Sequence, residues 1–239
     1  MKRALIFWGG WNGHEPELVA KRFSNILEGE GFAVQVVQGA ENVPGLDELN
    51  KLDLLVPVCT SSELPGETSK NIAKAVGAGL GLAGNHGGMC DAFRQDTEWQ
   101  FITGGQWVSH PGGEVEYTVN VIRNSSPITE GLEDFPVKSE QYYLHVDPCI
   151  EVLATTRFPL VNFYHASNKI VDMPVVWTKY WGTGRVFYNS LGHHDDVFDK
   201  SPNAQELMRR GFLWAAAGRD FAKATGWDYN QFLNEGKMY

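Results

Sequence analysis

The sequence predicts an α/β fold with three layers and a mostly parallel central sheet, which carries antiparallel additions in the second half of the chain. In the first 84 residues, short apolar runs alternate with amphipathic helical segments, which is the pattern of βαβ units. In the second half, segments of alternating polar and apolar residues follow one another, which is typical of antiparallel strands. No convincing linker interrupts the sequence, so residues 1–239 are predicted to form a single domain.

The elements of the first half follow from the spacing of apolar residues. Residues 14–31 are a predicted helix, because apolar residues recur at helical spacing until Gly29 and Gly31 end it. Residues 65–79 are a second predicted helix, with Pro65 near its start. Four short apolar runs of the kind that a parallel sheet buries are predicted strands, at residues 3–8, 32–37, 52–58 and 80–84.

The elements of the second half are mainly strands. The last two are joined by Gly182 and Thr183, and this short connection predicts an antiparallel hairpin. An amphipathic helix follows at residues 201–218. The predicted strands of this half are residues 114–122, 152–158, 173–181 and 184–192.

Composition excludes several classes of partner. The chain has 20 Lys and Arg against 29 Asp and Glu, a net charge of −9, and no basic run, so we expect no nucleic-acid partner. No apolar run approaches the roughly 20 residues that span a bilayer, so we expect no membrane segment. The three cysteines, Cys59, Cys90 and Cys149, are a poor disulfide framework and indicate a reducing, cytoplasmic location.

Histidines follow several predicted strands at the points where the strands end. In a doubly wound sheet, ligands bind beyond these carboxyl ends. His14, His86 and His193 are therefore expected to share one edge of the sheet, as candidate ligands of a divalent metal such as zinc or manganese. The sequence has no closely spaced metal motif, so such a site is assembled from distant loops. The loop "GGWNG" lacks the Lys-Ser/Thr end of a P-loop, and we expect no nucleotide.

The stretch "GNHGG" places His86 where some hydrolases carry their nucleophile. The pattern G-x-nucleophile-x-G after a strand exposes Ser or Cys on a sharp turn. A histidine at a strand end is often only a hydrogen-bonded surface residue, but glycines on both sides favour a functional role. We expect His86 on the exposed rim, as a catalytic base or a metal ligand, with Asn85 beside it to bind an oxyanion.

Two further segments carry candidate residues. In "GGQWVSHPGG", Trp107 and His110 lie in a Gly- and Pro-rich loop of the kind that often forms a wall or a lid. In "SEQYYLHVDP", Glu140 and Tyr142 would share one face of a strand, and His145 would face the other way. The sequence leaves open which face meets the strand ends.

The segments "ALIFWGGWNGHEP", "GLAGNHGG", "SEQYYLHVDP" and "PVVWTKYWGTGRVFYNSLGHHDDVF" resemble the ThuA-like family, named after a trehalose-utilisation protein. The resemblance runs over roughly residues 1 to 218 and leaves a C-terminal extension from about residue 219. It implies a fold similar to class I glutamine amidotransferases and thus flavodoxin-like. Because His86 replaces the catalytic cysteine of that fold, we expect no glutaminase activity.

The resemblance implies a carbohydrate-catabolic enzyme that acts on a sugar or a 3-keto-glycoside. The reaction expected is proton abstraction next to a carbonyl, followed by elimination, hydration or isomerisation. The alternatives are a sugar- or effector-binding protein without catalysis and a thiol hydrolase using Cys90 or Cys59. We further expect a small-molecule carbohydrate as partner and a homo-oligomer. The expected catalytic residues are His86, Glu140 and His145, and the expected substrate-binding residues are Trp11, Asn12, Asn85, Trp107, His110 and Tyr142.

Overall fold

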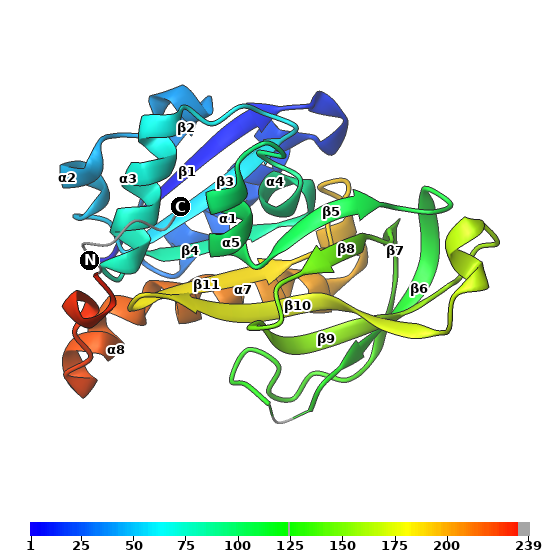
Figure 1. Ribbon diagram of the computed structural model, residues 1–239. Coiled ribbons are helices and arrows are strands. Elements are labelled where there is room, and N and C mark those ends of the chain that lie inside the picture. Colours follow the sequence, from blue (N-terminus) through cyan, green and yellow to red (C-terminus); the bar gives the residue numbers. More distant parts are fainter. Residues whose placement is uncertain (124, 234–239) are drawn as a thin grey trace.

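The computed structural model describes residues 1–123 and 125–233 (Figure 1). Its centre is a nine-stranded sheet in the order β2-β1-β3-β4-β11-β10-β9-β6-β7. The parallel half contains β2 (Ala33–Gln38), β1 (Arg3–Gly10), β3 (Leu54–Thr60), β4 (Gly81–Asn85) and β11 (Gly184–Asn189). Because these strands run the same way, their carboxyl ends lie along one edge of the sheet. The four strands predicted in the first half therefore share one sheet, and the α/β fold class is confirmed.

The other half of the sheet is antiparallel. It contains β10 (Val171–Trp181), β9 (Glu151–Phe158), β6 (Glu114–Val121) and β7 (Phe135–Glu140). The predicted hairpin forms between β10 and β11, and β11 also pairs in parallel with β4, so it joins the two halves. The strand β7 was not predicted. It lies at the edge of the sheet, where a strand tolerates a proline such as Pro136 because no hydrogen bond to a further strand is needed. A separate two-stranded sheet pairs β5 (Gly105–Ser109) with β8 (Tyr143–Val146).

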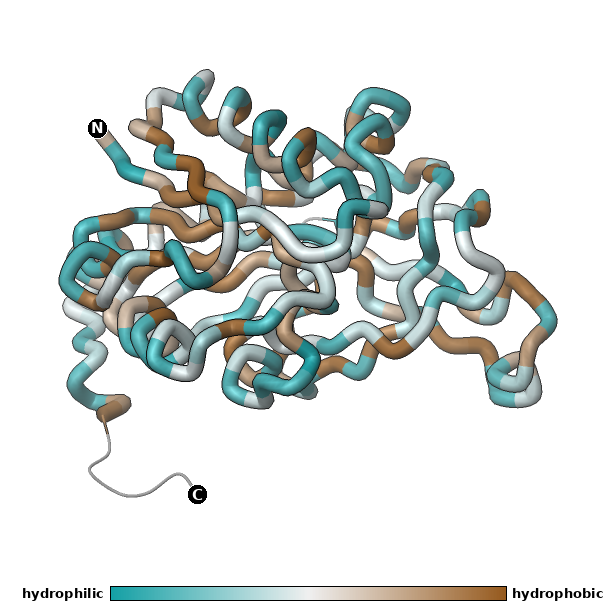
Figure 2. The backbone as a smooth tube through the Cα atoms, turned by 90° about the horizontal axis from the view of Figure 1, so that it is seen from above, coloured by the Kyte–Doolittle hydropathy of each residue, from teal (hydrophilic) through white to brown (hydrophobic). Residues whose placement is uncertain are grey.

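Helices cover both faces of the sheet and make the three layers (Figure 1). On one face α1 (Pro16–Gly29) and α7 (Pro202–Ala216) bury their apolar residues. On the other face lie α3 (Gly66–Gly77), α4 (His86–Cys90) and α5 (Thr97–Thr103). Alternate residues of β1 enter the two cores, as the pleat of a strand requires. Figure 2 shows apolar segments along the inner strands and mostly hydrophilic ones at the outer turns.

Short helices complete the chain and tie its C-terminal part to the domain. Arg185 of β11 lies 4.8 Å from the ring of Trp214 and 4.5 Å from that of Phe221, so α8 (Gly218–Thr225) packs on its own chain. The last part of the expected extension, residues 234–239, lies outside the described residues. Within residues 1–123 and 125–233, none of the helices has the length and apolar character needed to cross a membrane. The remaining short helices are α2 (Leu46–Leu49), α6 (Val197–Lys200), η1 (Asn12–His14), η2 (Ala40–Asn42), η3 (Tyr164–Ser167) and η4 (Tyr229–Phe232).

Candidate functional site

Three histidines and one glutamate meet at the carboxyl edge of the parallel strands. His14 follows β1, His86 follows β4, His193 follows β11, and Glu140 ends β7. All four side chains are buried. The Oε2 atom of Glu140 lies 3.2 Å from His86 Nε2, 3.6 Å from His14 Nε2 and 3.1 Å from His193 Nδ1. We refer to these four residues as the histidine–glutamate cluster.

The turn that carries His86 has the strained geometry of a nucleophile elbow. Its φ angle of +43° is in the left-handed region, which residues other than glycine rarely adopt. The surrounding structure fixes this conformation, because the Tyr188 hydroxyl donates a hydrogen bond of 3.0 Å to the backbone oxygen of His86. The imidazole is held as well, with Nδ1 2.7 Å from the Ser190 backbone oxygen. The elbow therefore aims the other ring nitrogen, Nε2, at Glu140.

The expectation that His86 lies on an exposed rim is wrong. Its exposed fraction is 1%, because the ring of Tyr142 stacks on the imidazole at a centroid distance of 3.9 Å. The sequence could not show this contact, since Tyr142 comes from a segment more than 50 residues away that has no pairing signal. Replacement of His86 therefore removes packing against Tyr142.

Gly87 explains why glycine follows the histidine of the elbow. A Cβ atom at this position would lie 2.6 Å from Nδ1 and Cε1 of His14, closer than real Cβ contacts occur. The missing side chain lets the His14 ring approach the start of α4. His14 is then fixed from the other side, where its Nδ1 lies 2.8 Å from the Thr60 hydroxyl.

Burial and mutual contact shift the pKa values inside the cluster. Burial lowers the pKa of His86 to about 3, although its contact with Glu140 acts in the opposite direction. Burial also lowers the pKa of His14. For Glu140, burial acts to raise the pKa, but the contacts with His14, His193 and His86 outweigh it and hold the pKa well below its usual range. Glu140 is therefore a carboxylate at neutral pH, facing neutral His86 and His14.

A pocket of about 540 Å³ opens beside the cluster. Trp11 has an exposed fraction of 54% and stands edge-on to His14 at the pocket mouth, with ring centroids 4.7 Å apart. His110 is partly exposed, and its Nε2 lies 3.4 Å from Oε1 of Glu140. The pocket is therefore aromatic on its walls and polar where it meets the cluster. It is lined by Trp11, His14, Ser61, Asp91, Arg94, Trp107, His110, Glu140 and Tyr142.

Three residues expected in the site lie elsewhere. Asn12 is exposed on η1 and does not line the pocket. Asn85 is buried below it, and one of the two N–H groups of its amide donates a hydrogen bond of 3.1 Å to the Leu191 backbone oxygen. His145 is exposed on β8, on the face opposite that of Leu144, which enters the core. The inner face of this segment is therefore that of Tyr142 and not that of His145.

Three pocket residues were not among the expected ones. Asp91 and Arg94 form a two-pronged ion pair with distances of 2.6 and 2.9 Å, and the guanidinium lies 4.6 Å from the ring centroid of Trp107. Their position depends on the end of the short helix α4, and no pattern of residue types marks it. Ser61 directly follows β3, so the rule that ligands bind beyond the carboxyl ends of parallel strands (the strand-end rule) could have found it.

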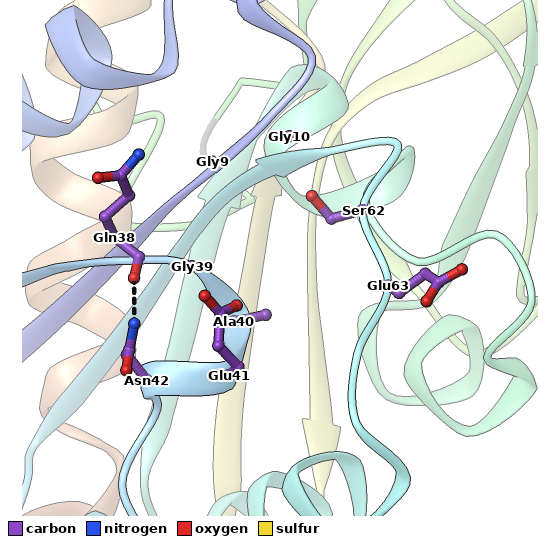
Figure 3. Close-up of a pocket in the computed structure, with 9 residues that line it drawn as sticks. All are labelled: Gly9, Gly10, Gln38, Gly39, Ala40, Glu41, Asn42, Ser62 and Glu63. Carbon is purple, nitrogen blue, oxygen red and sulfur yellow. Dashed lines mark hydrogen bonds between the residues drawn. The ribbon is translucent and has the colours of Figure 1, made fainter.

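A second hollow of about 500 Å³ lies at the ends of β1, β2 and β3 (Figure 3). Its lining includes Gly10, which directly precedes Trp11, and Ser62, which directly follows Ser61. Glu41 and Glu63 contribute carboxylates to its wall, and the Asn42 amide donates to the Gln38 backbone oxygen (Figure 3). The lining of the hollow includes no histidine and none of the expected site residues, so the first pocket is the candidate functional site.

Comparisons with known proteins agree with this fold. The family model described as ThuA, trehalose utilisation, matches residues 3–215. A ThuA-like protein from Parabacteroides merdae ATCC 43184 is 22% identical, with a TM-score of 0.74 and coverage of 91% of each chain. A ThuA-like protein from Bacteroides uniformis ATCC 8492 is 20% identical, with a TM-score of 0.72 and coverage of 90% of this chain and 91% of that one.

A cytoplasmic protein from Salmonella typhimurium LT2 is more distant. It is 12% identical, with a TM-score of 0.60 and coverage of 91% of this chain and 98% of that one. At these identities the likeness to solved structures shows the fold alone. A search of curated proteins finds no match.

Proposed function

Because this chain belongs to the ThuA family of trehalose utilisation, we propose that it is a carbohydrate-catabolic enzyme that acts on a 3-keto-glycoside. The reaction is removal of the proton next to the keto group, followed by loss of the substituent at C1. The observation that carries the proposal is the pocket at the strand ends, where aromatic walls meet the His110–Glu140 pair.

The walls of the pocket suit a sugar ring. Trp11, Trp107 and Tyr142 supply aromatic surface, on which the apolar face of a pyranose can pack. Asp91, Arg94 and Ser61 supply hydrogen-bonding groups along the same lining. The volume of about 540 Å³ lies in the range of small-molecule sites. The pocket can therefore bind and orient a carbohydrate by shape and polarity.

His110 is the residue best placed to accept the proton. It lines the pocket and is partly exposed, whereas His86 is buried behind Tyr142 and does not line it. The Nδ1 atom of His110 is buried, so Nε2 is the nitrogen that takes the proton. Glu140 Oε1 lies 3.4 Å from this Nε2, so the carboxylate can stabilise the imidazolium that forms. We therefore assign the base to His110 and a positioning role to Glu140, in place of the base role expected for His86.

The proposed elimination needs no external oxidant or reductant. In a 3-keto-glycoside the C2–H bond is acidic because the carbonyl at C3 stabilises the enolate. The C2 proton passes to His110, the enolate re-forms the ketone, and the C1–O bond breaks to leave a C1=C2 double bond. The departing alkoxide takes a proton from water, and His110 returns its own to solvent. The products are an unsaturated 3-keto sugar and the free alcohol.

Turnover of a methyl 3-keto-glucoside, followed by proton NMR, tests the proposal. We expect release of methanol by the wild type and a rate lower by about 10²-fold or more in His110→Gln, which is the scale of a lost acid–base group. His145→Gln is the matched control, because His145 is exposed and outside the pocket, and its rate should equal that of the wild type.

Two outcomes would contradict the proposal. If the wild type binds the keto sugar without converting it, the chain is a sugar-binding protein, which the aromatic walls alone would also serve. If His110→Gln turns over at the wild-type rate, the base is another residue. Folding of each variant is checked by circular dichroism, so that loss of activity is not confused with unfolding.

A further inference from the structure

We propose that His14, His86, Glu140 and His193 together bind one divalent transition-metal ion at the inner end of the pocket. This proposal deepens the proposed function but does not need it, because metal binding is measured without substrate. The basis is the arrangement of three imidazole nitrogens around a single carboxylate oxygen, with all four potential ligand atoms within 4.8 Å of one another.

The spacing of these atoms is that of ligands around a metal. Bonds of about 2.0 to 2.2 Å to a common ion place neighbouring ligand atoms roughly 3.0 to 3.5 Å apart in tetrahedral or octahedral geometry. Glu140 Oε2 lies 3.2, 3.6 and 3.1 Å from the nitrogens of His86, His14 and His193. The distance of 3.6 Å is too long for a hydrogen bond. A shared ion accounts for all three distances.

In His86 and His14, the ring nitrogen that faces away from Glu140 has its own polar contact, as is usual for metal-bound histidines. The Nδ1 atom of His86 faces the Ser190 backbone oxygen, which can only accept, so this nitrogen carries the hydrogen and Nε2 keeps a lone pair when the ring is neutral. His14 is held in a similar orientation, with Nδ1 at the Thr60 hydroxyl, which can donate or accept, and Nε2 toward Glu140. Such outer contacts fix the tautomer and orientation of metal-bound histidines.

In the part of the chain that the structure describes, the side chains that form ion pairs with Glu140 are all histidines, so no Lys or Arg compensates the charge of this buried carboxylate. Because Nδ1 of His86 faces a backbone oxygen, Nε2 is the nitrogen available to a cation between it and the Glu140 oxygen 3.2 Å away. His193 Nδ1 is buried and, among the described residues, has no hydrogen-bond partner although Glu140 is 3.1 Å away. Both features are relieved by one ion that accepts the lone pairs of all the ligands.

Three nitrogens and one oxygen select the class of metal. Mg²⁺ and Ca²⁺ prefer oxygen ligands, whereas imidazole suits zinc and its neighbours in the first transition row. The carboxylate of Glu140 is a ligand that also suits Mn²⁺. We therefore expect Zn²⁺ or Mn²⁺. When bound, such an ion supplies a Lewis acid that can polarise the keto oxygen of a sugar in the pocket. Glu140 then serves two partners, the ion through Oε2 and His110 through Oε1.

Metal analysis and thermal melting of the whole protein test the proposal. We expect about one equivalent of Zn²⁺ or Mn²⁺ per chain after purification from supplemented medium. Addition of ZnCl₂ or MnCl₂ to the metal-stripped wild type should raise its melting temperature. In His193→Ala the affinity for the metal should fall by about 100-fold or more, because a direct ligand is lost. Even the loss of a residue that only contacts a ligand lowers metal affinity by about 10- to 100-fold. His145→Ala should bind like the wild type.

A spectroscopic measurement keeps the test independent of stability. Co²⁺ added to the stripped wild type should give visible absorption bands typical of nitrogen and oxygen ligation, and these should be absent in His193→Ala. The proposal is overturned if the wild type binds less than about a tenth of an equivalent, or if His193→Ala and the wild type bind equally. In the first case the cluster is an ion pair of Glu140 with protonated histidine. Binding of metal without turnover of keto sugar would overturn the proposed function and leave the metal site standing.

Discussion

Glu140 connects the two parts of the site, because its two oxygens face different groups. Oε2 points at the three cluster histidines, and Oε1 points at His110 on the pocket side. The strand-end rule was enough to bring His14, His86 and His193 together from sequence. It could not choose between the faces of the segment that carries Tyr142 and His145, because that choice depends on the core into which Tyr142 packs.

The cysteines give a prediction at the residue scale. Cys59 and Cys90 are buried, and burial raises the pKa of Cys59 to about 12 and that of Cys90 well above its usual value, whereas Cys149 is exposed. Thiols with raised pKa values stay protonated and unreactive at pH 8. We expect Ellman's reagent to modify one thiol quickly in the native protein and three after denaturation. The fast reaction should disappear in Cys149→Ser.

Fast modification of Cys90 in the native protein would contradict this prediction. A reactive Cys90 would also support the alternative of a thiol hydrolase, which needs a reactive thiolate.

At the scale of elements, α7 lies close against the sheet because Gly211 has no side chain. A Cβ atom here would overlap the ring of Phe187 in β11. The sequence predicted this helix within one or two residues of its observed ends, since its apolar spacing is regular. The strands β5 and β7 were not predicted, and β5 lies in a glycine-rich stretch that favours a loop.

Gly211→Ala tests the packing of α7. Alanine favours a helix by about 1 kcal/mol over glycine, but overlap with Phe187 should cost about 1 to 3 kcal/mol or more. We therefore expect a lower free energy of unfolding, measured by urea denaturation. Gly29→Ala in α1 is the matched control, because no atom lies within 4 Å of the added Cβ. Equal stability of the two variants, or a gain of stability in Gly211→Ala, would show that the close approach of α7 to Phe187 does not depend on Gly211.

At the scale of the whole molecule, each half of the sheet supplies part of the site. The parallel half places three histidines at one edge, and the antiparallel half adds Glu140 from its outermost strand. The first arrangement could be predicted, because parallel strands have a fixed direction. The second could not, because it depends on the pairing of β7 with β6 and of β6 with β9, which local patterns do not specify. The expected homo-oligomer stays a prediction, which light scattering can test.

Exchange of the C2 proton tests directly whether this site removes a proton next to a sugar ketone. A methyl 3-keto-glucoside is incubated with the protein in D₂O, and the C2–H signal is followed by proton NMR. We expect loss of this signal at a rate proportional to protein concentration, and a rate lower by about 10²-fold or more in His110→Gln. A C2–H signal that persists at the background rate while the wild type is saturated with the keto sugar would contradict it.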